Sequence, residues 1–350
     1  MEIQVDLRSD TVTKPSPSMR EAMARAYVAD DVIDRDPTVE RLEERTARML
    51  GQEAGLFTAS GSMANLVALM THLGRGDRFY APREAHVLSH ELGTGAWLAG
   101  GLPSELPWTL GPGVPSPEDI AAAAAKEPRP PAYYDLTTKL VCLENTHNQA
   151  GGSIIPPAVQ TELAAAVHAA GWALHLDGAR LWHAAAALDV TPAEAAVGAD
   201  SVTVCFSKGL GAPVGSMLCG TKDFIKRAWR ARKALGGGMR QAGVLAAAAL
   251  VALDEELPRI EEDHRRAMML AEAIRATGLD CPVPPTNILL VRPPRGSSLT
   301  VRDLWAGWRA AGIGCFPMGE AVRLVVHRDT QLVEIATAIN LITDATHAML

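Results

Sequence analysis

The chain has 350 residues, a length that suits one large domain and a smaller one, and 48% of them are hydrophobic, enough for a sizeable core. The net charge of −7 and a pI of about 5.8 provide no basic surface of the kind that binds nucleic acid, so no nucleic-acid partner is expected. The five cysteines are odd in number and form no C-x-x-C pair, which argues against a disulfide framework and favours a reducing cytoplasm.

The sequence gives no sign of a membrane segment. Its first residues, MEIQVDLRSDTVTKP, are polar and lack the basic and apolar regions of a signal peptide. The most apolar long stretch, residues 242–253, is rich in alanine and too short to cross a bilayer, so a buried helix is the better interpretation. We therefore expect no membrane partner.

Short apolar runs alternate with helical patterns through the middle of the chain. Buried strands are predicted at residues 139–144, 172–177, 201–207 and 214–219, with helix-like stretches such as 157–170 and 191–197 between them. This alternation predicts βαβ units and a mainly parallel sheet, hence an α/β fold. A ligand of such a sheet binds beyond the carboxyl ends of its strands.

The pattern changes to α+β after about residue 250. We expect a long amphipathic helix at 258–277, a strand at 286–291, a helix near 299–311, a strand at 322–327 and a closing helix from 330. The chain is thus predicted to divide into an N-terminal arm with a large domain, residues 1–245, and a small C-terminal domain, residues 246–350. The arm is expected to pack on the small domain or to contact a neighbouring subunit.

Lys208 is the first candidate for chemistry. It lies in CFSKGLGAPVGS, where an apolar strand ends and a glycine-rich turn begins. A lysine there suits a covalent Schiff base, because desolvation or nearby cations lower the pKa of its amine and make it nucleophilic. The alternative is an ordinary solvated lysine in a turn.

Asp177, in HLDGAR, ends another predicted buried strand. A carboxylate in that position is costly without a cationic partner, and the pyridinium nitrogen of pyridoxal 5′-phosphate (PLP) is such a partner. A helix N-cap is the compatible alternative. Arg180, three residues on, offers a planar fork for a carboxylate or a phenolic oxygen, although a surface salt bridge is the commoner fate of an arginine.

Three further groups complete the candidate site. Ser60, Gly61 and Ser62 precede a clean helical pattern, so Ser60 is a candidate N-cap and the amides after it could bind a phosphate, with a plain cap as the alternative. His86, in EAHVLSHE, and His147, in LENTHN, could stack on a ring or move a proton near neutral pH.

Together these segments resemble one family, the low-specificity L-threonine aldolases. The resemblance runs from residue 6 to about residue 248, with VRLVVH near the end extending it, and it is carried by the segments DLRSDTVTKPS, ADDVIDRDPTVERLE, LENTHN, LHLDGARLW, SKGLGAPVGS and RKALGGGMRQAG. It implies PLP fold type I: a large domain with a mainly parallel sheet and a small α+β domain. It also implies cleavage of L-threonine, L-allo-threonine and other β-hydroxy-α-amino acids to glycine and an aldehyde.

The resemblance implies a role for each matching residue. Lys208 would carry the cofactor, Asp177 would pair with the pyridine nitrogen, and His86 would stack on the ring. His86 and His147 are both candidates for accepting the hydroxyl proton. The phosphate would be held by Gly61, Ser62 and Ser207, with Arg240 from a neighbouring subunit, and the substrate carboxylate by Ser9, Arg180 and Arg323. Active sites of this fold form at dimer interfaces, so a homodimer or homotetramer is expected.

Some positions depart from the family pattern. Ile33 and Asp34 follow ADDV where a tyrosine and a glycine are usual, and Glu91-Leu92-Gly93-Thr94-Gly95 replaces E-x-G-G-A. These changes bear on the preferred substrate side chain and leave cofactor binding unaffected. Another PLP reaction, such as β-elimination, racemisation or transamination, stays open, and so does a non-catalytic protein of the same fold. No catalytic metal is expected, because the histidines lack ligand spacing apart from the H-x-x-x-H of His86 and His90, and the resemblance gives that segment another role.

Overall fold

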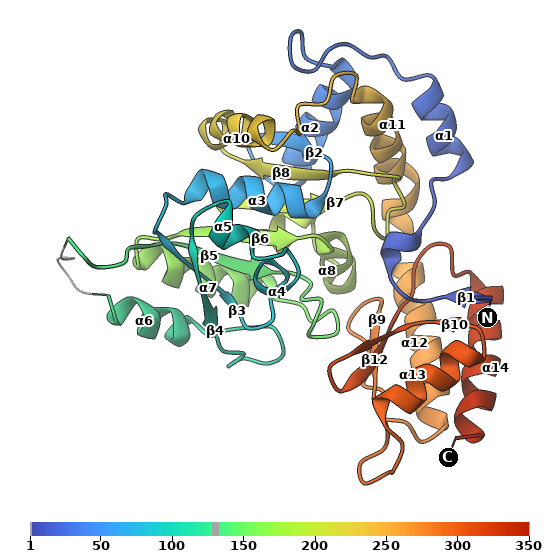
Figure 1. Cartoon of the computed structure of the whole chain (residues 1–350). Coiled ribbons are helices and arrows are strands. Elements are labelled where there is room, and N and C mark those ends of the chain that lie inside the picture. The colour runs from blue at the N-terminus through green and yellow to red at the C-terminus, as the bar shows by residue number, and fades with distance from the viewer. Residues whose placement is uncertain (1, 128–132, 350) are drawn as a thin grey trace.

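The computed structural model describes residues 2–127 and 133–349, and its largest element is a sheet of seven strands (Figure 1). The strand order is β2-β8-β7-β6-β5-β3-β4, and all neighbours are parallel except those of β8, which is antiparallel to both β2 and β7. The strands are β2 Ala54–Thr58, β3 Arg78–Pro82, β4 Leu102–Leu106, β5 Thr138–Glu144, β6 Ala173–Gly178, β7 Ser201–Cys205 and β8 Ser216–Gly220. The mainly parallel sheet is therefore confirmed, and the four predicted strands correspond to β5, β6, β7 and β8.

Helices cover both faces of this sheet, which explains why its strands are continuous apolar runs. Alternate residues of one strand enter different cores: in β8, Leu218 packs with α3 and α10, whereas Met217 belongs to the main core on the other face. The helices that accompany the sheet are α1 Pro17–Ala24, α2 Pro37–Met49, α3 Gly61–His72, α4 His86–Ser89, α5 Thr94–Trp97, α6 Pro117–Ala125, α7 Pro157–Ala169, α8 Leu181–Leu188, α9 Pro192–Ala195, α10 Lys222–Ala234 and α11 Gly243–Val251.

The C-terminal part has its own small antiparallel sheet (Figure 1) and a separate core, which includes the fully buried Trp308. The predicted elements are present, with ends that shift by a few residues. They are α12 Ile260–Ala276, β9 Ile288–Val291, α13 Val301–Ala310, β10 Ile313–Gly314, β11 Phe316–Met318, β12 Ala321–Val325 and α14 Leu332–His347. The domain boundary expected near residue 245 falls at the start of α11. From there the backbone stays helical as far as α12. The boundary stays a prediction.

The N-terminal arm pairs with the C-terminal part of the chain, in a separate sheet of two strands. Strand β1, Val5–Asp6, pairs in parallel with β10, and the amide of Val325 donates to the Leu7 carbonyl at 2.9 Å. Val5 and Leu7 are buried in the C-terminal core. Of the two alternatives for the arm, the contact with the small domain is therefore the one observed within the chain.

The arm then crosses to the large sheet. Asp10 and Arg180 form a bidentate ion pair, with both N–O distances at 2.7 Å, and neither side chain reaches solvent appreciably. Burial opposes the charge on Asp10, but the Arg180 guanidinium together with the charges of Lys208 and His183 outweighs burial and holds the pKa of that carboxyl well below its usual range. The hydroxyl of Thr13 donates to the Lys208 carbonyl at 2.8 Å, so the arm also braces the turn after β7.

Among the described residues, no helix combines the length and the apolar character that a bilayer crossing requires.

Replacing Leu7 with alanine tests how far the arm contributes to the C-terminal core. Because Leu7 is fully buried there, the substitution should lower the free energy of unfolding by about 2–5 kcal/mol. The change is measured by urea denaturation against Leu332→Ala, a control whose side chain is 61% exposed. Equal midpoints for the two variants would show that the arm does not stabilise the fold.

Replacing Asp10 with asparagine should be far more damaging than its small size suggests. The change leaves the Arg180 charge buried without its anion, a loss typically of about 3–5 kcal/mol. The folded-state pKa of Asp10 is depressed, so its stabilising effect is present above the unfolded carboxyl pKa and is lost as pH falls below it. The stability difference between wild type and Asp10→Asn, measured by urea denaturation, should therefore shrink from pH 7 towards pH 3. Asp223→Asn, in an exposed pair with Arg227, should change stability little at either pH.

Candidate active site

Lys208 lies in the turn that follows β7, at the edge where the parallel strands end. Its carbonyl accepts from Thr13 and from the Gly211 amide at 2.9 Å, which fixes the turn from both sides. Its ammonium group lowers the pKa of both Asp177 and Asp10 by its positive charge. The lysine and the two carboxylates, far apart in the sequence, therefore share one electrostatic environment.

Asp177 is buried at the end of β6. Its Oδ1 accepts from the Ala179 amide at 3.0 Å, and its Oδ2 accepts from Asn65 Nδ2 at 2.8 Å. Burial tends to raise the pKa of Asp177, but His86, Lys208 and the Asn65 hydrogen bond together lower it. The sequence thus placed a charged carboxylate correctly at this strand end.

His86 starts α4 and lies beside the same carboxylate. Its backbone amide donates to Glu144 Oε2 at 2.7 Å, and its ring Nδ1 lies 2.9 Å from Glu91 Oε1. Burial tends to lower the pKa of His86, whereas Glu91, Asp177 and Glu144 raise it above the ordinary value. The ring also stacks against His90, with centroids 5.6 Å apart.

One atom each of His86, Glu91 and Asp177 lie within 4.8 Å of one another, a spacing that could suit a metal ion. The amide of Asn65 lies between the two carboxylates, however, and donates to both of them at 2.8 Å. Its two N–H groups give one oxygen of each carboxylate a hydrogen-bond donor without a cation. The sequence expectation that no metal takes part stays a prediction.

The candidate phosphate cradle lies next to the end of β7. Ser60 caps α3 by accepting from the Met63 amide at 3.2 Å. A Cβ at Gly61 would lie only 2.9 Å from Cys205 Sγ, so this position needs glycine for the helix to approach the strand so closely. The N-terminus of α3, including the exposed Ser62, thereby meets the segment that carries Ser207 and Lys208.

Arg180 and Arg323 converge on one oxygen although they belong to different parts of the fold. Arg180 follows β6, Arg323 lies on β12, and both donate to Asn148 Oδ1, at 3.2 and 2.9 Å. Burial and the Arg180 charge lower the pKa of Arg323 to about 10, and its Nε is buried without a partner. Ser9 lies beside them, as the cap of the turn that begins at Asp10. Two facing cations with an unsatisfied donor form a site for an anion.

His147 is almost fully buried in the loop after β5. Its Nδ1 accepts from the Ala150 amide at 3.3 Å, its ring lies edge-on to Trp108, and its Nε2 has no hydrogen-bond partner. Since Nδ1 is used as an acceptor, the proton of a neutral ring sits on Nε2. His147 is thereby prepared to donate a hydrogen bond.

Arg240 stands apart from the other candidates. Its guanidinium is exposed and pairs with Asp30 at 3.1 Å, and among the described residues it has no hydrogen bond to the cradle. The structure of one chain therefore does not bring Arg240 together with the other predicted phosphate ligands.

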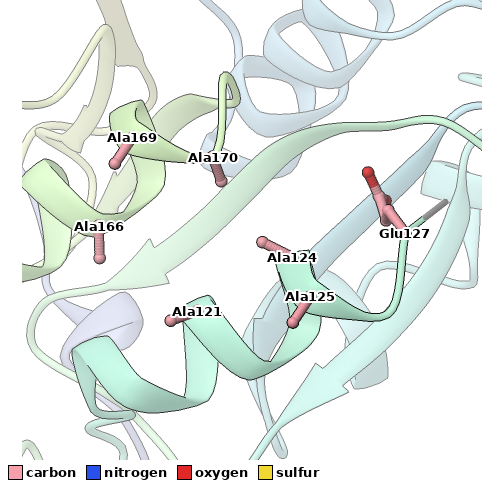
Figure 2. Close-up of a pocket in the computed structure, with 7 residues that line it drawn as sticks. All are labelled: Ala121, Ala124, Ala125, Glu127, Ala166, Ala169 and Ala170. Atoms are coloured by element: carbon pink, nitrogen blue, oxygen red, sulfur yellow. The ribbon is translucent and has the colours of Figure 1, made fainter. Parts of the chain in front are cut away.

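A groove between α6 and α7, shown in Figure 2, is unrelated to these residues. Its volume is about 490 Å³, and small side chains from both helices line it. Six of its seven lining residues are alanines, and the only ionisable one is Glu127. It offers no nucleophile, base or cation pair, so the chemistry belongs to the strand ends.

Sequence reasoning missed four polar residues that organise the site. Glu144 is opposite Asp177 in the β5–β6 register and holds the amides of His86 and Asn148, both at 2.7 Å. A carboxylate that ends a buried strand was a usable signal for Glu144, as it had been for Asp177. Asn65, a buried amide within an apolar helix, also carried a signal, whereas the pairing partners of Glu91 and Asn148 could not be read from spacing.

The donor set fits PLP. It comprises a lysine amine, a buried carboxylate opposite it, free helix amides for a phosphate and two converging arginines for a carboxylate. Two buried polar atoms at the site, Glu91 Oε2 and Arg323 Nε, have no hydrogen-bond partner within the described part of the chain. Such orphan groups are expected where a polar ligand belongs.

Comparison with known proteins agrees with this chemistry. Residues 6–293 match the beta-eliminating lyase family. The chain is 42% identical to low-specificity L-threonine aldolase 1 of Arabidopsis thaliana, covering 92% of this chain and 91% of the relative, and 41% identical to the low specificity L-threonine aldolase of Escherichia coli K12, covering 95% and 97%. The fold matches the threonine aldolase structure from Leishmania major with a TM-score of 0.82, at 20% identity and with 98% and 99% of the two chains covered. The chain therefore belongs to the low-specificity L-threonine aldolase family, a group of PLP-dependent carbon–carbon lyases within the wider beta-eliminating lyase family.

Proposed function

We propose that this enzyme cleaves L-threonine, L-allo-threonine and related β-hydroxy-α-amino acids to glycine and an aldehyde, with PLP as cofactor. One observation carries the proposal: Lys208 and the buried Asp177 lie at the ends of the neighbouring strands β7 and β6, and the positive charge of the Lys208 ammonium lowers the pKa of the Asp177 carboxyl. Bound PLP supplies a sink for the electrons released when a bond to the substrate Cα breaks. The small amino-acid substrate is common to the relatives described above.

The residues predicted to bind PLP would each hold a different part of the cofactor. Lys208 would attach PLP covalently, Asp177 would pair with the pyridine nitrogen, and His86 would lie against the ring. The low pKa of Asp177 keeps it charged at neutral pH, which is the condition for stabilising a positive ring nitrogen. The phosphate ligands would be Ser60, Gly61, Ser62 and Ser207 of one chain and Arg240 of a neighbouring one.

Arg180 and Arg323 would hold the substrate carboxylate, with Ser9 at its edge and Arg180 also within reach of the cofactor's phenolic oxygen. Both guanidinium groups donate a hydrogen bond to the same atom, Asn148 Oδ1, which holds them close together. A planar fork fixes both the position and the rotation of a carboxylate. This grip would orient the amino acid so that the bond to be broken is correctly aligned, which is catalysis by positioning.

The structure favours His86 over His147 as the group that accepts the hydroxyl proton. His86 Nδ1 faces Glu91, so Nε2 of a neutral ring is left to accept a proton. His147 has the opposite arrangement, because Nδ1 already accepts from Ala150 and Nε2 carries the proton. We assign His86 as the base and His147 as a hydrogen-bond donor.

The exposed Arg240 supports the expectation that the working unit is a homodimer or homotetramer. Arg240 makes no hydrogen bond to the cradle of its own chain among the described residues, so it is available to a neighbouring chain, and closed symmetric assemblies are the common outcome for soluble enzymes. We also propose a cytoplasmic location, on the odd cysteine number and the five free, buried thiols.

Replacing Lys208 with alanine tests the assignment directly. Because its amine is the proposed attachment point, the variant should still bind PLP but lose nearly all release of acetaldehyde from threonine. Both are followed in one cuvette, by the visible absorbance of PLP and by a coupled aldehyde assay. Lys226→Ala, at an exposed position of α10, is the matched control and should retain full activity. Wild-type turnover in Lys208→Ala would refute the assignment.

A substrate panel separates aldol cleavage from the other reactions of this fold. Threonine and β-phenylserine should yield an aldehyde and glycine, whereas serine should give no pyruvate and L-alanine should not racemise. Each product is assayed separately with the same preparation. Pyruvate or D-alanine as the main product would assign the protein to β-elimination or racemisation instead.

A further inference from the structure

The function proposed above uses the contact between His86 and Glu91 only to identify Nε2 as the free ring nitrogen, and it gives Glu91 no role of its own. His86 Nδ1 and Asn65 Nδ2 both approach the same oxygen, Glu91 Oε1, at 2.9 and 2.8 Å. Glu91 is only 4% exposed, so its carboxylate depends on these two donors in place of water. Burying a carboxylate with so few hydrogen-bond partners costs free energy, and such groups are concentrated at functional sites.

The amide of Asn65 can take only one orientation in this network. Its nitrogen donates to Glu91 and to Asp177, so its oxygen must accept, and the group that donates to it is His175 Nε2 at 3.2 Å. His175 Nδ1 in turn lies 2.8 Å from Ser201 Oγ. Burial lowers the pKa of His175 to about 4, which keeps it neutral and able to play this part at neutral pH.

We propose that Glu91 is a positioning residue for His86: its Oε1 accepts from Nδ1, holds the ring in place and leaves Nε2 as the proton-accepting atom. The proposal rests on the function proposed above, since it matters for catalysis only if His86 is the base. Asn65 completes the arrangement, because it ties Glu91 to Asp177 and so fixes the ring relative to the carboxylate that faces the cofactor.

Several titratable groups face His86 and have to be counted with Glu91. Asp177 comes from β6, Glu144 from the end of β5, and the His90 ring from the residue that directly follows α4. Burial lowers the pKa of His86, and the hydrogen bond to Glu91 is the strongest influence that raises it. The pKa of Glu91 is itself raised, by burial first and by Asp177 as well. An imidazole ordinarily holds a proton more tightly than a carboxyl group does, so the shared proton rests on Nδ1.

The variant Glu91→Gln separates charge from geometry. Both hydrogen bonds end on Oε1, so an amide oxygen in its place can still accept from His86 and Asn65, while the negative charge is gone. Glu91→Ala removes both. Glu43→Gln is the matched control, because Glu43 is an equally buried carboxylate whose hydrogen-bond partners are the Phe57 amide and Arg35.

The test is the titration of His86 itself, read by NMR on protein labelled with ¹⁵N-histidine, with the signal assigned by its loss in His86→Gln. In wild type, the neutral ring should be protonated at Nδ1. In Glu91→Gln the pKa of His86 should fall by about one unit or more with the same tautomer, because an opposite charge in contact has been removed. In Glu91→Ala the preference for the Nδ1 tautomer should disappear as well, and Glu43→Gln should match wild type.

Activity supplies a second reading. Because the base must be neutral, the acid limb of kcat/KM against pH should move to lower pH in Glu91→Gln, in step with the NMR titration. A wild-type ring protonated at Nε2, which needs no variant to observe, or an unchanged His86 titration in Glu91→Gln would overturn the proposal. Failure of the function is distinct: wild type would then release no aldehyde, whatever the tautomer of His86.

Discussion

A carboxylate at the buried end of a central strand is the constraint around which this protein is arranged. Removing Asp177 from water costs several kcal/mol, and the cost is bearable only where donors and cations face the group. Asn65 supplies a donor from α3, His86 a ring from α4, and Lys208 an ammonium from the next strand end. Each comes from a different element of the chain. Stabilising one charge therefore brings Lys208, His86 and Asp177 together in one place.

The second constraint is the N-terminal arm, which links the two cores. It adds a strand beside β10, places Leu7 in the C-terminal core, and then delivers Asp10 to Arg180 and Thr13 to the Lys208 turn. Residues 7–13 of the arm thus connect the C-terminal core to the segments that carry Arg180 and Lys208. The alternative that the arm contacts another subunit is not needed to explain its burial in this chain.

Much of this could be predicted because parallel strands leave a clear pattern. A buried apolar run followed at once by a charged residue is unusual, and that pattern identified Asp177, Arg180 and Lys208 before any contact was known. Strands β2, β3 and β4 were not predicted, and nothing in the apolar run of β8 indicates that it is antiparallel, since both of its faces are covered either way. Glu91 and Asn148 act through partners from other segments, and such pairings follow from tertiary structure alone.

The residues around the predicted position of the substrate carboxylate come from three parts of the chain. The site has one net positive charge, which is the sum over three largely buried residues: Asp10 of the arm, Arg180 directly after β6, and Arg323 of β12. Asn148 offers both arginines a neutral oxygen, which holds them in position but leaves that charge uncompensated. A substrate carboxylate would bring the group to neutrality. Because Arg323 lies on β12 of the small sheet and Arg180 directly follows β6 of the large one, that carboxylate would bridge the two parts of the fold.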